Sequence, residues 1–387
     1  MRCEHWERSE CRSCTWLDIP LDTQVQMKDD AARQALAALP YASAIEWLSP
    51  ATSSETAFRT KAKLVVGGTP RRPTLGTLDH ERAGVDLPTC RIQHPAINSA
   101  IPALKRIIRA LRLQPYDITQ KRGELKYIHI NVGTDDALML RFVLRSRERL
   151  NDVRAALGLI RTLIPSARVI SANIHPRHEA TLEGPDEIIL TKRKTVPLSV
   201  GDVELLVGPR SFVQTNTHVA GELYRQVSIW AALALPSGEA PHSMWDLYCG
   251  VGGFALSCAA RGFEYVTGVE LSHEAIASAR EAAKAAGIGR KRSDFLAADA
   301  TEWARTRDAL AQPDVVVVNP PRRGIGSDLA NWINESSVPR LVYSSCNPLT
   351  LAQDLEAMPA YRATQARLFD MFPHTSHAEV AVVLHRA

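Results

Sequence analysis

The sequence predicts an α/β protein whose C-terminal half forms a mostly parallel, Rossmann-like sheet, preceded by an α+β region. Three observations indicate this. Strand-like runs alternate with alanine-rich helical segments from about residue 243, whereas the strands before them are joined by short turns. Four of the seven cysteines also fall in the first quarter of the chain. We therefore expect three regions, at residues 1–92, 93–205 and 206–387.

Length and composition agree with a globular protein of more than one domain. The chain has 387 residues, of which 45% are hydrophobic and 23% charged. Its longest apolar runs, such as Val315–Val318, are too short to span a membrane. The first residues contain no apolar signal segment, so we expect a cytoplasmic protein. A net charge of +4 permits a nucleic-acid partner without indicating one.

The region before residue 206 predicts α+β structure with mainly antiparallel strands. Its first part has one short helix-like run, Ala31–Leu39. Later helices are expected at residues 96–113 and 152–163, and strands at 126–132, 138–144, 168–174 and 187–190. The first of these helices is amphipathic, with Lys105, Arg106, Arg109 and Arg112 on its polar side. Because Gly133–Asp136 is a turn signal, the first two strands should form a hairpin.

The C-terminal region alternates strands with helices, which is typical of a parallel sheet covered on both faces. Strands are expected at residues 244–248, 265–270, 295–298, 315–318, 341–344, 365–369 and 379–384. Helical segments such as Glu274–Ala286 stand between several of them. The last two strands have no helical segment between them. They can therefore pair as a hairpin, which would place one antiparallel strand in the sheet.

A glycine-containing turn, Asp246–Gly253, closes the first of these strands and predicts a nucleotide site. Glycines there let a ligand approach the backbone closely. Glu270 ends the second strand, where its carboxylate can accept hydrogen bonds from both hydroxyls of a ribose. Asp299 ends the third strand, where its carboxylate can meet the amino group of an adenine. The third glycine of the dinucleotide fingerprint is missing, so the pattern favours S-adenosylmethionine over NAD. The alternative is that Gly250 only shapes a tight turn.

A cysteine and a carboxylate are predicted to meet at the same edge of the sheet. Asn319-Pro-Pro-Arg-Arg-Gly follows one strand, Cys346 follows the next, and Glu379 begins the last. Methylation of a uracil at C5 needs a thiolate that adds to C6 and a base that removes the C5 proton. Cys346 and Glu379 offer these two groups. The alternatives are that Cys346 is a core residue and that Glu379 is a solvated strand residue.

The thiol of Cys346 should need local help to ionise, because a free cysteine has a pKa near 8.5. Arg322 or a protonated His374 could supply a positive charge. Cys249 and Cys258, by contrast, are interpreted as core residues.

Four motifs together resemble the RNA uracil-C5 methyltransferases: Asp246–Gly253, Asn319–Gly324, Ser344–Pro348 and His377–Val380. The resemblance implies a class I S-adenosylmethionine-dependent methyltransferase domain with Cys346 as the nucleophile and Glu379 as the base. It implies cofactor contacts from Gln214, Tyr248, Glu270 and Asn319, beside Gly250 and Asp299 at the other strand ends. Many relatives have Asp where this chain has Asn319, so Asn319 is not expected to act as a charge.

The N-terminal cysteines predict a metal site. Cys11 and Cys14 are close enough in sequence to bind one metal, and four thiolates suit zinc or a [4Fe–4S] cluster. Zinc and unrelated free thiols remain alternatives on spacing alone. The set Cys3, Cys11, Cys14 and Cys90 resembles the iron–sulfur ligands of the ribosomal-RNA members of the family. Since Cys3 stands almost at the first residue, we expect no extra RNA-binding barrel domain.

Three further stretches, Phe58–Lys63, Lys121–Tyr127 and Leu140–Ser146, resemble the 23S rRNA (uracil-747-C5) members of the family. The resemblance implies 23S rRNA as the partner, with no membrane and no obligate protein partner. Basic residues that could contact phosphates are Arg59, Lys61, Lys63, Lys121, Arg122, Lys126, Arg141 and Arg145. Each could instead belong to a solvated surface.

Three rival functions remain open on the sequence. An amino-methyltransferase would also use an Asn-Pro-Pro turn, but with an aromatic residue where this chain has Arg322, and it would need no cysteine. A non-catalytic iron–sulfur RNA-binding protein would not bind S-adenosylmethionine. The third rival is the same chemistry on tRNA.

Overall fold

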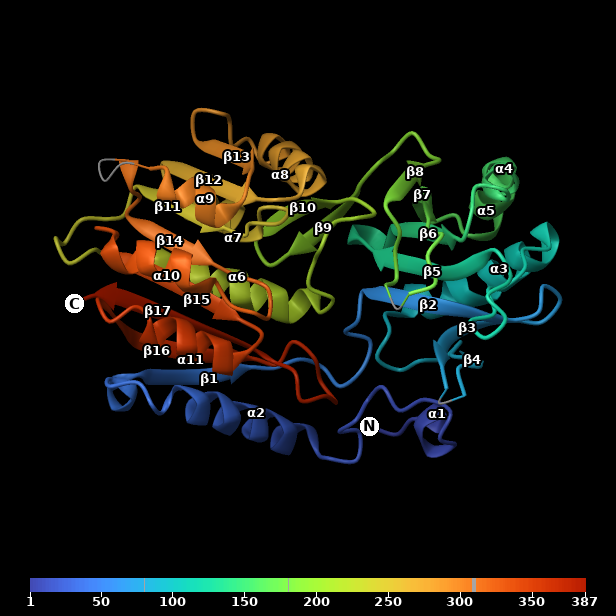
Figure 1. The fold of residues 1–387 in the computed structure, drawn as a ribbon, viewed down its shortest axis with the longest axis horizontal. Coiled ribbons are helices and arrows are strands. Elements are labelled where there is room, and N and C mark those ends of the chain that lie inside the picture. The colour runs from blue at the N-terminus through green and yellow to red at the C-terminus, as the bar shows by residue number, and fades with distance from the viewer. Residues whose placement is uncertain (80, 180, 308–310) are drawn as a thin grey trace. The chain divides into compact units, whose positions relative to one another are not determined.

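The structure is a computed structural model that describes residues 1–79, 81–179, 181–307 and 311–387 (Figure 1). The chain divides into two compact units. Unit 1 comprises Met1–Leu17, Ser54–Leu198 and Val207–Pro209, and unit 2 comprises Asp18–Ser53, Ser199–Leu206 and Arg210–Ala387. These units differ from the three regions expected at 1–92, 93–205 and 206–387, because an N-terminal helix and strand join the C-terminal sheet.

The helices and strands carry the labels of Figure 1. The helices are α1 (Glu4–Glu7), α2 (Leu21–Leu36), η1 (Ala42–Ala44), α3 (Pro95–Leu111), η2 (Thr134–Asp136), α4 (Leu150–Ala155), α5 (Leu157–Leu163), α6 (Thr217–Ala231), α7 (Gly253–Ala260), α8 (His273–Ala285), α9 (Ala300–Arg305), α10 (Gly326–Glu335) and α11 (Pro348–Glu356). The strands before residue 210 are β1 (Glu46–Ala51), β2 (Lys61–Gly68), β3 (Pro73–Leu78), β4 (Gly84–Asp86), β5 (Leu125–Val132), β6 (Leu138–Leu144), β7 (Ala167–Ile174), β8 (Asp186–Ile189), β9 (Val196–Val200) and β10 (Val203–Val207). The later strands are β11 (Ser243–Leu247), β12 (Tyr265–Glu270), β13 (Ser293–Ala297), β14 (Val315–Val318), β15 (Arg340–Ser345), β16 (Tyr361–Phe369) and β17 (Glu379–Arg386). No described helix is both long and apolar enough to cross a membrane.

Unit 2 contains the Rossmann-like sheet that the sequence predicts. Its strand order is β1-β16-β17-β15-β14-β11-β12-β13. Neighbouring strands are parallel except β17, which is antiparallel to both β15 and β16. All seven strands expected after residue 243 are present, and the hairpin of the last two is confirmed. The predicted α/β fold class is therefore confirmed.

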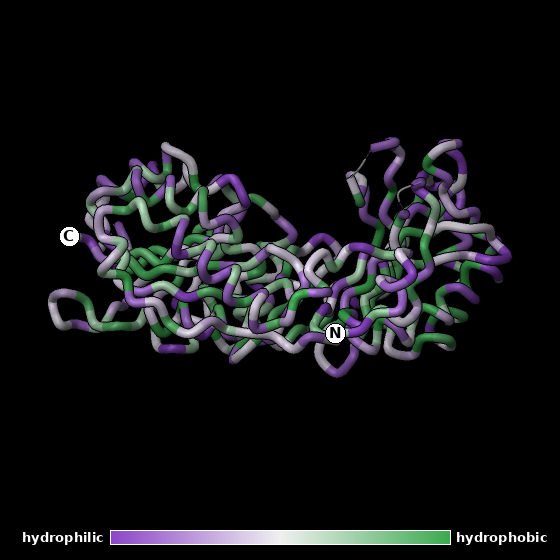
Figure 2. The backbone as a smooth tube through the Cα atoms, turned by 90° about the horizontal axis from the view of Figure 1, so that it is seen from below, coloured by the Kyte–Doolittle hydropathy of each residue, from purple (hydrophilic) through white to green (hydrophobic). Residues whose placement is uncertain are grey.

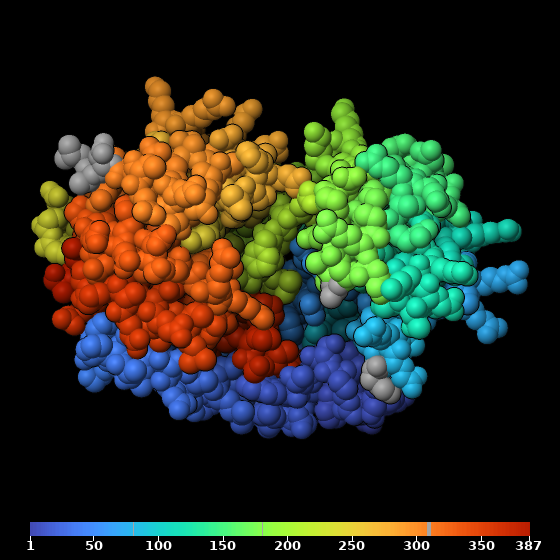
Figure 3. Space-filling view, viewed as in Figure 1, coloured from blue at the N-terminus to red at the C-terminus, as the bar shows by residue number. Residues whose placement is uncertain are grey.

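The structure contains more regular structure in the first part of the chain than the single helix-like run, Ala31–Leu39, that the sequence predicts. Helix α2 begins at Leu21 rather than near Ala31, and β1 extends the sheet by pairing with β16. Polar residues fill the first half of α2, so its apolar pattern is weak, yet Gln24 and Lys28 are buried. Helix α2 packs on α11, and the space-filling view shows its surface (blue) against C-terminal residues (red; Figure 3).

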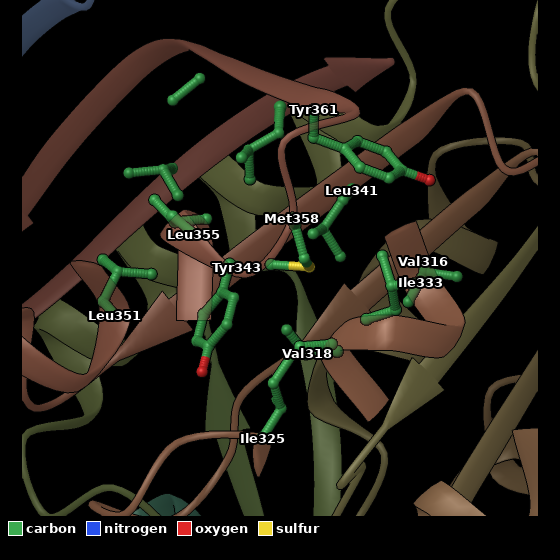
Figure 4. Close-up of a cluster of buried hydrophobic side chains, with 14 of the residues drawn as sticks. Val316, Val318, Ile325, Ile333, Leu341, Tyr343, Leu351, Leu355, Met358 and Tyr361 are labelled. Atoms are coloured by element: carbon green, nitrogen blue, oxygen red, sulfur yellow. The ribbon is translucent and has the colours of Figure 1, made fainter. Parts of the chain in front are cut away.

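The core of unit 2 joins the sheet to α2, α9, α10 and α11. Figure 4 shows the part of this core in which residues of β14 and β15 pack against α10 and α11. The four valines of β14 are fully buried, as expected for a parallel strand covered on both faces. Burial of each such side chain contributes about 1.5–3 kcal/mol. Tyr343 is also fully buried, and its hydroxyl donates to Asp354 Oδ2 at 2.6 Å. This bond links β15 to α11, the two elements between which Cys346 lies.

Unit 1 is built on a seven-stranded sheet of order β4-β3-β2-β5-β6-β7-β8. Its described strand pairs are antiparallel except β6–β7, and the predicted β5–β6 hairpin is confirmed. Helix α3 buries one apolar stripe in the core of this unit, as its amphipathic pattern predicts. Segments of hydrophobic residues (green) gather inside each unit (Figure 2).

Candidate active site

A cavity of about 630 Å³ in unit 2 contains every catalytic and cofactor residue that the sequence predicts. It lies at the carboxyl ends of the parallel strands, where open α/β sheets bind ligands. The predicted residues that line it are Gln214, Tyr248, Gly250, Glu270, Asp299, Asn319, Cys346 and Glu379. The structure thus brings the eight residues together, while their individual roles remain predictions.

The turn after β11 is shaped to receive a ligand close to the backbone. Buried Asp246 accepts a hydrogen bond from the backbone N–H of Ala255 at 3.0 Å, which ties β11 to α7. Burial raises the pKa of this carboxyl to about 8. Tyr248 and Gly250 both have left-handed backbone conformations, with φ of +67° and +53°. A Cβ added at Gly250 would meet no atom within 4 Å, so this glycine faces open space.

Two carboxylates stand at the ends of β12 and β13. Glu270 accepts hydrogen bonds from the backbone N–H groups of Ser272 (2.9 Å) and Gly250 (3.3 Å), and so joins the glycine turn to the start of α8. Asp299 caps α9 by accepting from the N–H groups of Thr301 and Glu302. Capping alone gives Asp299 a structural role, beside its place in the cavity wall.

The antiparallel strand β17 brings Glu379 to Cys346. In the β15–β17 ladder Ser344 pairs with Ala381, and Ser345 pairs with Val380. Continuing this register by one residue places Cys346 opposite Glu379. A parallel strand would have put its first residue at the other edge of the sheet. The antiparallel topology therefore creates the thiol–carboxylate pair that the sequence predicts.

The environment of Glu379 suits a general base. Its side chain is almost fully buried, and Oε1 accepts from Asn319 Nδ2 and from Ser344 Oγ, both at 2.7 Å. Burial raises the pKa of Glu379 to about 7, although the two hydrogen bonds oppose the shift. A carboxylate that titrates near neutral pH can accept a proton and then release it.

Arg322 is the cation beside Cys346. Burial raises the pKa of this thiol and the charge of Glu379 raises it further, whereas the charge and hydrogen bond of Arg322 lower it. The other candidate, His374, is buried against α2, where its backbone N–H donates to Gln24 Oε1 at 2.7 Å. The geometry therefore favours Arg322 as the group that helps Cys346 to ionise.

The loop that carries Arg322 is fixed by the helix that follows Cys346. The carbonyl of Arg322 accepts from Asn347 Nδ2 at 3.3 Å and from Thr350 Oγ1 at 3.2 Å. The N–H of Ile325 donates to Asp354 Oδ2 at 2.9 Å. Because these partners belong to α11 and its N-cap, the same hydrogen bonds hold the backbone of the Arg322 loop next to the segment that carries Cys346.

Sequence reasoning missed a polar clamp between α2 and the segment before β17. Lys28 Nζ donates to Asp370 Oδ1 at 2.5 Å, and both side chains are almost fully buried. Lys28 also donates to the carbonyl of Phe372, a residue that lines the cavity. Gln24, one helical turn earlier on α2, holds the backbone of His374. The spacing of Gln24 and Lys28 on one helix face was the available signal.

The four N-terminal cysteines line a second cavity, of about 280 Å³, inside unit 1. Burial, together with the charges of Cys90, Cys11 and Cys3, raises the pKa of Cys14 to about 12, so the four sulfurs lie close together. Four thiols form a donor set that suits a metal or cluster. In the part of the chain that the structure describes, however, no group of three or more His, Cys, Asp or Glu side chains is arranged to hold a metal ion.

The structure divides the basic residues proposed to contact RNA. Arg141 is buried and forms ion pairs with Glu183 and Glu187, so it belongs to the interior of unit 1. Lys126 is also buried, and its ammonium donates to a backbone carbonyl. Arg145 pairs with a buried carboxylate, that of Glu124, and Lys61 is half-buried. Exposed positions are occupied by Arg59, Lys63, Lys121 and Arg122.

Comparison with known proteins identifies the family. The family model described as tRNA (Uracil-5-)-methyltransferase matches residues 197–387. The chain is 45% identical to the 23S rRNA (uracil(747)-C(5))-methyltransferase RlmC of Halothiobacillus neapolitanus and 44% identical to that of Cronobacter sakazakii, over 100% of each chain. The solved structure of the Pyrococcus abyssi tRNA (uracil-54, C5)-methyltransferase in complex with S-adenosyl-L-homocysteine shares the fold, with a TM-score of 0.77 and 24% identity over 96% of this chain and 85% of that chain. The chain therefore belongs to the RNA uracil-C5 methyltransferase family.

Proposed function

We propose that this protein transfers the methyl group of S-adenosylmethionine to C5 of a uridine in 23S rRNA, at the position 747 named for its relatives. The observation that carries the proposal is the pairing of Cys346 with Glu379 inside the cavity that also holds the glycine turn. Full-length similarity to the 23S rRNA enzymes supports the choice of RNA. A cytoplasmic location and independence from protein partners remain predictions.

Four features of the cavity fit S-adenosylmethionine. The open space at Gly250 admits a ligand next to the backbone, and the carboxylate of Glu270 stands where ribose hydroxyls can donate to it. Gln214 and Tyr248 complete the wall between this turn and Asn319. When bound, the cofactor supplies an electrophilic methyl group on a sulfonium centre.

The side chains of the cavity can carry out the remaining steps. The thiolate of Cys346, stabilised by Arg322, forms a bond to C6 of the uracil, and the electron pair of the C5–C6 double bond becomes available at C5. C5 then forms a bond to the methyl carbon, the bond between that carbon and the sulfonium sulfur breaks, and its electron pair stays on the sulfur, which leaves as a thioether. Glu379 removes the C5 proton, the C5–C6 double bond reforms, and the bond between Sγ and C6 breaks. The thiolate is regenerated, and the proton leaves Glu379 to solvent.

The target uracil must leave its base stack to reach this cavity, because C5 and C6 are hidden in a helix. The exposed basic residues of unit 1 are candidates to contact phosphates of the RNA. If they do so, binding should weaken steeply as salt is added.

Tritium release tests this function. Transcripts of 23S rRNA containing 5-tritiated uridine are incubated with the protein, with and without S-adenosylmethionine, and tRNA serves as the parallel substrate. We expect release from the ribosomal transcript that requires both the cofactor and Cys346. Release only from tRNA would show the right chemistry on another RNA. Methylation that survives Cys346→Ala would indicate an amino-methyltransferase.

We propose further that Cys3, Cys11, Cys14 and Cys90 hold a [4Fe–4S] cluster, which would fix the N-terminal segment of unit 1. The support is the shared cavity and the mutual effect of the four thiols on the pKa of Cys14. Anaerobically purified protein should contain about four iron and four sulfide per chain. Cys14→Ser should lose them, whereas Cys258→Ala, which changes a buried cysteine of unit 2, should keep them. Bound zinc without sulfide would refute the cluster.

A further inference from the structure

We propose that Ser344 and Asn319 are positioning residues that hold Glu379 by one carboxylate oxygen and leave the other, Oε2, to receive the C5 proton. This inference rests on the proposed function, since it assigns a place for the proton that C5 methylation releases. It concerns two residues for which the sequence predicted no such role.

Three hydrogen bonds join the three side chains in a closed ring. Asn319 Nδ2 donates one hydrogen to Ser344 Oγ at 2.8 Å and the other to Glu379 Oε1 at 2.7 Å. Ser344 Oγ donates to the same Oε1, also at 2.7 Å. Each donor hydrogen in the ring has an acceptor, and the hydroxyl both accepts and donates. Each of the three hydrogen bonds can therefore have only one donor and one acceptor when Glu379 is ionised.

The sheet places these groups side by side. Strand β14 pairs in parallel with β15 up to Val318 and Tyr343, so Asn319 and Ser344 occupy the next position of the two strands. Ser344 is fully buried. It stands two residues before Cys346, and residues separated by two share one face of an extended chain. The end of β15 thus presents the hydroxyl that holds the base, and then the thiol that attacks uracil.

The direction of the bonds decides which oxygen can act as the base. A proton on Oε1 would face two donors, the amide and the hydroxyl, and would displace at least one of them from a buried site. Oε2 takes part in neither bond, and Glu379 lines the cavity. The ring thus keeps Oε1 as an acceptor and turns Oε2 toward the substrate.

Loss of the Ser344 hydroxyl should slow one step selectively. Attack by Cys346 and transfer of the methyl group do not need the ring, so they should continue. Proton removal needs a charged and oriented Glu379, and the hydrogen bonds from Ser344 and Asn319 favour the charged form. The methylated covalent adduct between Cys346 and RNA should then accumulate.

The test compares Ser344→Thr with Ser344→Val in the full-length protein. The two side chains have nearly the same shape, and only Thr keeps the hydroxyl. The measurements are tritium release from 5-tritiated 23S rRNA and the amount of protein–RNA adduct that survives denaturation, each between pH 6 and pH 9. Ser344→Thr should resemble the wild type. Ser344→Val should release tritium about ten- to a hundredfold more slowly at pH 7 and should accumulate adduct.

The pH profile separates positioning from a structural defect. Without the hydroxyl, the charged form of Glu379 loses a hydrogen bond, so the acid limb of the release profile should move to higher pH by roughly one unit. Asn319→Asp replaces two donors by a carboxylate beside Glu379 and should move the limb in the same direction. This second variant carries the test if Ser344→Val does not fold.

Two results would overturn the inference. The first is tritium release from Ser344→Val that equals release from Ser344→Thr across the pH range. The second is an equal loss of adduct formation and release with an unchanged pH profile, which would indicate only a structural role. Absence of release by the wild type would instead refute the proposed function.

Discussion

Replacing Glu379 by Gln should stabilise the protein at neutral and alkaline pH while it blocks turnover. The carboxyl of Glu379 is buried, and its pKa is raised from an ordinary value of 4.5 to about 7. The folded state therefore binds this proton more tightly than the unfolded state. The stability that the protonated carboxyl confers is present below pH 4.5 and is lost as the pH rises through 7. Gln is neutral at every pH and avoids this loss.

The magnitude follows from the difference between the two pKa values. The pKa rises from 4.5 in the unfolded chain to about 7 in the folded protein, a difference of about 2.5. At roughly 1.4 kcal/mol per unit, the free energy of unfolding of Glu379→Gln should exceed that of the wild type by about 3 kcal/mol above pH 7. The hydrogen bonds of Asn319 and Ser344 need no rearrangement, because the Gln carbonyl can accept both.

Urea denaturation followed by tryptophan fluorescence measures this difference. Five of the seven tryptophans (Trp47, Trp230, Trp245, Trp303 and Trp332) lie in unit 2, so the signal reports mainly on the unit that contains Glu379. Midpoints are compared from pH 5 to pH 9. Glu356→Gln, which removes an exposed carboxylate at the end of α11, serves as the matched control and should show little change.

Equal stability of Glu379→Gln and the wild type at pH 8 would contradict this effect of burial. A difference in stability that does not shrink toward pH 5 would contradict it as well. A variant that is stabilised as expected and also retains turnover would separate the burial of Glu379 from its role as the base.

Three further predictions concern the buried ion pair of α2 and the two catalytic groups of the cavity. Lys28→Met leaves Asp370 as an unpaired buried charge and should lower the free energy of unfolding by about 3–5 kcal/mol in the same urea assay. Adding Asp370→Leu should restore most of this loss, and no effect of Lys28→Met would refute the buried ion pair. Arg322→Ala should slow adduct formation on 5-fluorouridine RNA without weakening S-adenosylmethionine binding by calorimetry, and an unchanged adduct rate would show that another group assists Cys346. The wild-type rate of tritium release should rise with pH through about 7 as Glu379 loses its proton, and a flat profile from pH 6 to pH 8 would contradict the base assignment.

The C-terminal sheet could be predicted because its local signals agree with its tertiary structure. Runs such as Val315–Val318 are apolar throughout, as strands covered on both faces must be, and alanine-rich segments mark the helices between them. The absence of a helical segment between β16 and β17 was sufficient to predict the antiparallel strand. The edge where Cys346 and Glu379 meet then followed from strand direction alone.

The N-terminal part of unit 2 could not be predicted, because its order depends on distant partners. Helix α2 is stabilised by the contacts of Gln24 and Lys28 with the segment before β17, more than three hundred residues later in the chain. Local periodicity does not contain such contacts. For the same reason, no role for Asp370 could be predicted from local sequence.

The candidate site could be predicted by residue type but not by contact. The cavity contains the eight residues expected of it, yet the ring of Asn319, Ser344 and Glu379 depends on the register of three strands. Arg141 illustrates the opposite case. Sequence suggested a surface cation for RNA, and the alternation of β6 does place Arg141 on the face opposite the apolar core, but ion pairs with Glu183 and Glu187 bury it there.

The most direct test of the proposed mechanism is covalent trapping on RNA. The protein is incubated with S-adenosylmethionine and 23S rRNA containing 5-fluorouridine. This base carries fluorine in place of the C5 hydrogen, so Glu379 has no C5 proton to remove and the adduct cannot break down. Digestion and mass spectrometry then identify the linked peptide and nucleotide. We expect one adduct, between Cys346 and a methylated fluorouridine at a single position, and none with Cys346→Ala. An adduct on another residue, or methylation of ordinary 23S rRNA without any trapped adduct, would contradict it.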